Sequence, residues 1–128
     1  MYLVSIRNRK SRVAMTKFRL SDHNLMIEKG RHSGMAEEKR LCPFCEDTVE
    51  SECHFLLVCK LYNRNHLINA GLNVAPNLLN WPINNRFIFL MSQGDRELTN
   101  MIAFAIKHWM EYRKDCLELC NLINLLMK

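Results

Sequence analysis

Residues 42–59 read CPFCEDTVESECHFLLVC and contain four of the six cysteines of the chain. The spacing is Cys-x2-Cys-x8-His-x4-Cys. Two thiolates separated by two residues can reach one ion from a tight turn, and zinc takes four nitrogen or sulfur ligands in a tetrahedron. The sequence therefore predicts a structural Zn²⁺ site with ligands Cys42, Cys45, His54 and Cys59. With four protein ligands no position stays open for water, so hydrolytic metal chemistry is not indicated.

The cysteines of this stretch also allow other interpretations. The four could be ordinary buried thiols, because free cysteine is among the most buried residue types. A redox Cys-x-x-Cys is the main rival, but such motifs belong in a βαβ context, which this sequence lacks. Cys53 could replace His54 as a ligand, although adjacent side chains point in different directions. Cys116 and Cys120 have a helical spacing that favours core packing over a second metal site.

The last ligand pair poses a geometric difficulty. Residues five apart on an ideal α-helix lie about 140° from each other. His54 and Cys59 can both face one ion only if His54 lies in the first turn or the helix is distorted near Cys59. We therefore expect His54 near a helix start, with Ser51 as the N-cap.

The 128 residues around this stretch suit one domain, and 48% hydrophobic residues exclude a collagenous, low-complexity or disordered chain. No apolar run is long enough to span a bilayer, and no apolar core follows the basic N-terminus as in a secretory signal. We expect an intracellular protein, nuclear or cytoplasmic and not secreted. In a reducing compartment its cysteines stay reduced or bind metal.

Positive charge is concentrated in the first 40 residues. They hold ten Lys and Arg against four acids, a net +6, whereas residues 41–128 sum to −1. Such asymmetry is typical of a nucleic-acid contact, and RNA or DNA is the predicted partner, without sequence preference. A solvated basic arm without a partner is the alternative. The predicted phosphate contacts are Arg7, Arg9, Lys10, Arg12, Lys17, Arg19, Lys39 and Arg40.

The apolar periodicity predicts a mainly α fold: a small CCHC zinc knuckle with a basic N-terminal helix and C-terminal helices. We divide it into a basic helix and loop arm (1–40), the metal motif with its helix (41–70) and a helical C-terminal region (71–128), within one domain overall. Helices are expected over about 10–20, over Glu52–Ala70 with Gly71 ending it, and over 97–127 with Asp95 as cap. Residues 24–41 are expected to form an extended or looped connection and residues 72–83 a loop. Residues 84–91 are expected to form a short helix or strand.

The helix expected over 97–127 ends in CLELCNLINLL (116–126), which is apolar on more than one face. A small domain cannot cover such a segment easily, so a helical protein partner or self-association through 97–127 is a second expectation. The alternative function is thus a zinc-stabilised protein–protein interaction module. A third is a decayed fragment without selected activity.

Several segments together resemble a known family. They are TKFRLSDHNL (16–25), IEKGR (27–31), RLCPFC (40–45) and ESECHFLLVCKLY (50–62). This order resembles the zinc-binding segment downstream of the polymerase domain in reverse transcriptases of non-LTR (LINE-type) retrotransposons, and short reading frames derived from them. Similarity is strongest over 16–62 and weaker to about 113.

The resemblance implies Cys42, Cys45, His54 and Cys59 as zinc ligands and a role in holding nucleic acid during target-primed synthesis. Lys60 stands where many relatives have Pro, and Cys53 where many have an acidic or aromatic residue. The chain has only four aspartates, none adjacent to another, whereas two-metal phosphoryl transfer needs clustered carboxylates. We therefore expect a non-catalytic binding module and not an enzyme. Phe18, Phe44 and Tyr62 are candidates for base stacking, with core packing as the alternative.

Overall fold

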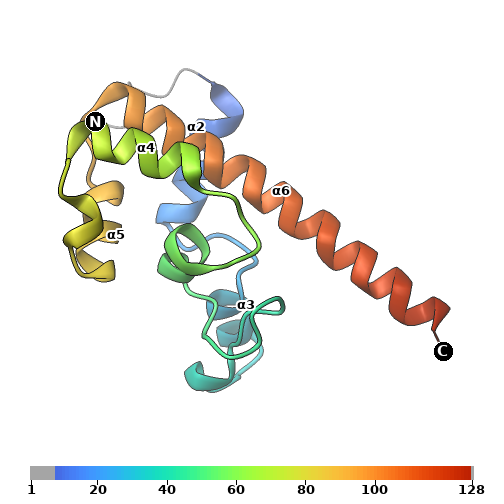
Figure 1. Ribbon diagram of the computed structural model, residues 1–128. Helices are drawn as coiled ribbons and strands as arrows, with labels where there is room; N and C mark the ends of the chain where they lie inside the picture. Colours follow the sequence, from blue (N-terminus) through green and yellow to red (C-terminus); the bar gives the residue numbers. More distant parts are fainter. Residues whose placement is uncertain (1–7, 128) are drawn as a thin grey trace.

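The computed structural model describes residues 8–127, and the described chain is mainly helical (Figure 1). Its α-helices are α2 (Arg9–Arg19), α3 (Met26–His32), α4 (Asn65–Val74), α5 (Ile83–Met91) and α6 (Arg96–Leu126). Short 3₁₀ turns lie at Glu37–Lys39 (η1) and Leu78–Asn80 (η3), and a π-helical turn at His54–Val58 (η2). Among the described residues, β pairing is limited to an isolated antiparallel bridge between Leu41 and Val49.

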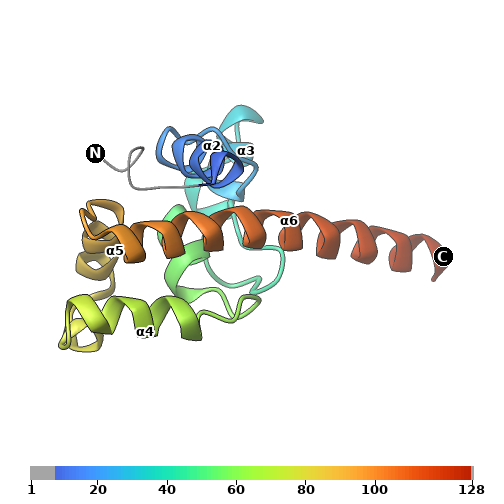
Figure 2. The same ribbon diagram turned by 90° about the horizontal axis from the view of Figure 1, so that it is seen from above.

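The long helix α6 organises the fold. Helices α2 and α4 pack along its first half, on different sides (Figures 1 and 2). Its second half extends alone beyond the rest of the molecule. The domain is therefore built around one end of a helix whose other end has no cover from the described chain.

The core forms where α6 meets α2 and the metal-binding segment. Ile102 and Ile106 of α6 are completely buried, as is Phe55 of η2. Phe18 of α2 packs on Phe55 with ring centroids 5.7 Å apart. Burying each such side chain contributes about 1.5–3 kcal/mol. The basic helix α2 is thus fixed to the body through its apolar face.

Three sequence predictions are confirmed. Helices occur at Arg9–Arg19 and Arg96–Leu126, close to the expected bounds. The carboxylate of Asp95 accepts a hydrogen bond from the Leu98 N–H at 2.9 Å and caps α6. Residues 83–91 are helical, which settles the choice left open between helix and strand.

The connection expected over 24–41 was wrong in part, because it contains the helix α3. This helix ends at His32, and Gly34, which follows the cap residue Ser33, has a φ of +74° that suits glycine. Met35 N–H donates to the Gly30 carbonyl at 2.8 Å and Gly34 N–H to that of Arg31 at 3.2 Å, which closes the helix end. At seven residues, α3 is too short to show a clear period in sequence.

The single helix expected over Glu52–Ala70 was also wrong. The chain turns extended at Cys59 (φ −56°, ψ 127°), and α4 begins only at Asn65. Gly71 does not end α4, which continues to Val74. Gly71 instead allows Leu78 to pack closely, since a Cβ there would lie 2.7 Å from a Leu78 methyl carbon.

A search of the described helices for a segment long and apolar enough to cross a membrane finds none.

Candidate metal centre

A short hairpin at residues 40–50 presents the first two ligands. Glu50 N–H donates to the Arg40 carbonyl at 2.9 Å, and Cys42 N–H to that of Thr48 at 2.8 Å. The Cys-Pro-Phe-Cys turn is closed by Glu46 N–H, which donates to the Cys42 carbonyl at 2.8 Å. Pairing of the two arms and this tight turn place the thiols of Cys42 and Cys45 on the same side.

The other two ligands come from the turn that follows. The Ser51 hydroxyl accepts a hydrogen bond from the His54 N–H at 3.1 Å, so Ser51 caps the helical start as predicted. Cys59 N–H then donates to the His54 carbonyl at 2.7 Å. This five-residue bond defines a π-turn, and it brings residues five apart onto one side. The distortion predicted from the His54–Cys59 spacing is confirmed.

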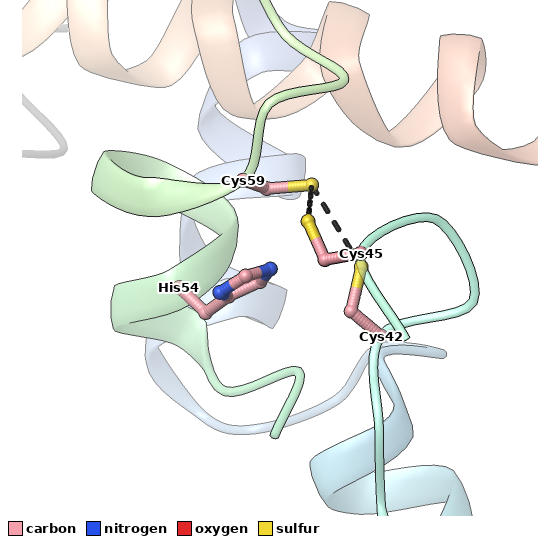
Figure 3. A group of neighbouring side chains, drawn as sticks. All are labelled: Cys42, Cys45, His54 and Cys59. Carbon is pink, nitrogen blue, oxygen red and sulfur yellow. Dashed lines mark hydrogen bonds between the residues drawn. The ribbon is translucent and has the colours of Figure 1, made fainter. Parts of the chain in front are cut away.

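The four side chains meet at one point (Figure 3). One ligand atom from each of Cys42, Cys45, His54 and Cys59 lies within 4.8 Å of the others. The Cys59 sulfur is 3.8 Å from the sulfurs of both Cys42 and Cys45. Two sulfurs bound tetrahedrally at about 2.3 Å from one ion would be about 3.8 Å apart. The two sulfur–sulfur distances at Cys59 match this value.

Burial favours the uncharged forms of these side chains when no cation is bound. Desolvation raises the pKa of Cys59 to about 12, with the neighbouring Cys42 thiol adding to the rise. Burial also raises the pKa of Cys42, against an opposing effect of main-chain hydrogen bonds at Cys45 and Phe44. The pKa of His54 is lowered, mainly by desolvation, which favours the neutral imidazole that metals bind.

The His54 ring is the clearest indication that this cluster suits a metal ion. His54 is buried, yet neither ring nitrogen has a hydrogen-bond partner. An unpaired buried polar group costs about 1–3 kcal/mol. A metal ion bound by one nitrogen removes much of that cost, so the donor set and the orphaned ring together fit a metal site.

Arg64 closes the centre from the side of the last ligand. Its Nη2 donates to the Cys59 carbonyl at 2.6 Å and its Nε to the Leu56 carbonyl at 3.1 Å. The guanidinium also lies over the Trp109 ring, 5.6 Å from its centroid. Arg64 therefore ties the end of the π-turn to α6, in place of the helix that was expected to continue there.

Glu50 connects the centre to two helices. Its carboxylate pairs with Arg113 of α6 at 2.6 and 2.9 Å, and both side chains are buried. It also accepts from the Met26 N–H at 2.8 Å, at the start of α3. Sequence reasoning missed Glu50, Arg64 and Arg113, because single charged residues far apart in the chain carry no pattern.

The remaining cysteines lie outside the cluster. Cys53 is partly buried with a pKa raised by desolvation, and its thiol is not part of the metal-binding group. Cys116 is partly buried and Cys120 exposed. The core packing favoured for this pair is therefore wrong for Cys120, because α6 has left the body of the domain there.

The predicted phosphate contacts occupy two environments. Arg9, Lys10, Lys17, Arg19 and Lys39 are exposed, and Arg12 is partly buried. Arg19 donates to the Met91 carbonyl. Arg40 is partly buried and donates to the carbonyls of Met35 and Ile27, so two of its donors hold α3. Arg7 lies outside the described residues.

The three candidate stacking residues belong to the packed interior. Phe18 and Tyr62 are buried, and Phe44 is partly buried against the core. Tyr62 stacks on Trp109 with ring centroids 5.2 Å apart. This arrangement supports the packing alternative for all three.

Comparison of the chain with known protein families, with curated proteins and with solved structures finds no match.

Proposed function

We propose that this chain is a nucleic-acid-binding module in which a structural Zn²⁺ ion, held by Cys42, Cys45, His54 and Cys59, fixes a basic helix for contact with phosphates. Zinc is the metal that best suits three thiolates and an imidazole at tetrahedral spacing. The ion would supply folding energy and no chemistry, because the protein fills all four positions.

The charge of α2 is the observation that carries the nucleic-acid assignment. Its eleven residues include five bases and no acid. Arg9, Lys10 and Arg12 lie in or near its first turn, where the helix dipole disfavours cations. A sequence that only needed a stable helix would place acids there, so this charge supports binding to a polyanion.

Phe55 links the metal centre to α2. Phe55 follows the ligand His54 directly and packs on Phe18 of α2. Ser11, Met15 and Phe18 are the buried residues of α2, and four of its five bases (Arg9, Lys10, Lys17 and Arg19) are exposed. The proposed zinc ion therefore holds α2 indirectly, by fixing the turn that carries Phe55.

The resemblance of residues 16–62 to the zinc-binding segment of LINE-type reverse transcriptases supports the same reading. It suggests an RNA or DNA ligand bound without base readout, and a module that is non-catalytic by itself.

A salt titration tests the proposal. Fluorescence anisotropy with labelled single-stranded and duplex oligonucleotides should show binding that weakens with salt. If all five bases of α2 contact phosphates, the slope of log K against log salt should be about −4.5 for duplex DNA and about −3.5 for single strands.

The deciding variant is the triple change Arg9→Ser, Lys10→Ser, Arg12→Ser. We expect it to reduce the slope by about 2–3 and to weaken binding at low salt. The matched control removes three bases elsewhere, Lys60→Ser, Arg96→Ser and Lys114→Ser, and should bind almost normally. Equal loss in both variants would mean that only net charge matters, and no loss in the first would exclude α2 as the contact.

A further inference from the structure

One periodic apolar stripe runs along the whole of α6. Its members recur at alternating spacings of four and three, which is the pattern of a coiled-coil seam. They are Leu98, Ile102, Ala105, Trp109, Tyr112, Cys116, Leu119, Ile123 and Leu126. The opposite side of the second half carries Lys114, Glu118, Asn121 and Asn124.

The stripe is buried at its start and exposed at its end, and Trp109 and Cys116 between them are partly buried. Leu98, Ile102 and Ala105 are at most 5% exposed. The last aromatic contact to the stripe comes from Tyr62, which stacks on the Trp109 ring and meets the Tyr112 ring edge-on. Beyond that point Leu119, Ile123 and Leu126 are 57%, 48% and 77% exposed. The seam thus continues for two heptads after its intramolecular partner stops.

We propose that the second half of α6 pairs with the same segment of a second copy, as an antiparallel two-helix coiled coil. A second copy presents an identical seam over 112–126, which satisfies the requirement of a two-fold interface for self-complementarity. The segment is already helical and spans about 21 Å, at 1.5 Å per residue.

The antiparallel direction follows from the position of the body. In the first half of α6, the same face is filled by the chain's own core. A parallel partner would run toward that filled space, and the two bodies would compete for it. An antiparallel partner places its own body at the opposite end of the paired segment, away from this core (Figure 2).

Charge supports pairing of this seam with a copy of itself. The charged residues within 112–126 are Arg113, Lys114, Asp115 and Glu118, none of which is a member of the stripe, and residues 119–127 carry no charged side chain. Two copies can therefore bring their seams together without burying a charge.

The test measures oligomeric state and direction with the full-length, zinc-loaded protein. Sedimentation equilibrium should show a concentration-dependent dimer. Leu119→Glu with Ile123→Glu should raise its dissociation constant about 100-fold or more, because the charges would be buried in the seam. The control Leu125→Glu alters an exposed leucine outside the stripe and should leave the dimer intact. Metal content and helical signal confirm that each variant folds.

Oxidation of cysteines by diamide then tests whether the two α6 helices of the dimer are antiparallel. The seam is centred near Leu119, so Cys120 of each copy lies close to the two-fold axis. A Cys53→Ser, Cys116→Ser protein should form covalent dimers, and a Cys53→Ser, Cys120→Ser protein should form few. The reverse order would indicate parallel helices, and a monomer at all concentrations, or a dimer unaffected by the Leu119 and Ile123 changes, would overturn the proposal. This proposal does not depend on nucleic-acid binding.

Discussion

Residues 40–59 and the helix α6 differ in what fixes their structure. The hairpin and π-turn are held by a few main-chain hydrogen bonds around a buried cluster of thiols and one imidazole. The first half of α6 is held by a continuous apolar stripe and a side-chain cap. In residues 40–59 the cluster of four ligand atoms holds the chain together. In the first half of α6 many packed side chains do so.

This contrast predicts how the two regions respond to mutation. If the cluster binds a metal as proposed, loss of one ligand atom should remove the ion and the whole cross-link, because metal-binding free energy is folding free energy in small sites. Loss of one packing contact in the first half of α6 leaves the other contacts in place. The predictions below follow that difference, beginning with the ligands.

Cys59→Ser should give the largest effect. Zinc sites of this kind contribute about 10–16 kcal/mol of apparent binding energy at pH 7. We expect the variant to lose the metal, the hairpin to lose its structure and α2 to lose its support at Phe55. Elemental analysis and far-ultraviolet circular dichroism measure both changes. Cys53→Ser is the control and should keep one metal ion per chain; full metal content in Cys59→Ser would contradict the assignment.

The buried ion pair of Glu50 and Arg113 connects residues 40–59 with α6. Arg113→Met should cost about 3–5 kcal/mol, because it leaves the Glu50 carboxylate buried without a counter-charge. The double change Glu50→Gln, Arg113→Met should recover much of this, since glutamine still offers an oxygen to the Met26 N–H. Urea unfolding of the metal-loaded proteins gives the free energies. If Arg113→Met lowered the free energy of unfolding by less than about 1 kcal/mol, the ion pair would not be an important connection between the two regions.

The sequence was most informative where chemistry or periodicity is local. The four ligands lie within 18 residues, and the spacing of His54 and Cys59 already required the distortion that the π-turn supplies. The long helix and its Asp95 cap were also readable, because an amphipathic pattern and a capping residue are local signals.

What sequence could not show are contacts between distant segments. Nothing near Glu50 indicates that Arg113, 63 positions later, is its partner. The spacing of the apolar residues predicted a helix that continues through Cys59. This prediction was wrong, and in the structure the carbonyls of Leu56 and Cys59 accept hydrogen bonds from the Arg64 side chain. The exposure of Cys120 depends on where the body ends, which no local pattern encodes.

Arg64 offers an intermediate test, because it touches the π-turn and α6 without being a ligand. Arg64→Gln should weaken zinc binding about tenfold, since groups around metal ligands typically tune affinity by this amount or more. Competition with a chromophoric chelator measures the change. Arg96→Gln, at an exposed base on α6, should leave the affinity unaltered. Equal affinities in Arg64→Gln and the native protein would mean that the π-turn is held by the ligands alone.

The smallest effect is expected at the cap of α6. Asp95→Ala removes the acceptor for the Leu98 N–H and should cost about 1 kcal/mol of unfolding free energy. Asp95→Asn keeps an acceptor oxygen, so its smaller loss isolates the contribution of the negative charge at the helix N-terminus. Zinc affinity should be the same in both variants, because the cap stabilises the helical layer and does not touch the metal region. If zinc affinity instead fell in proportion to the lost stability, α6 and the hairpin would have to fold as one inseparable unit, joined through Glu50 and Arg113 more tightly than the contrast between the two regions implies.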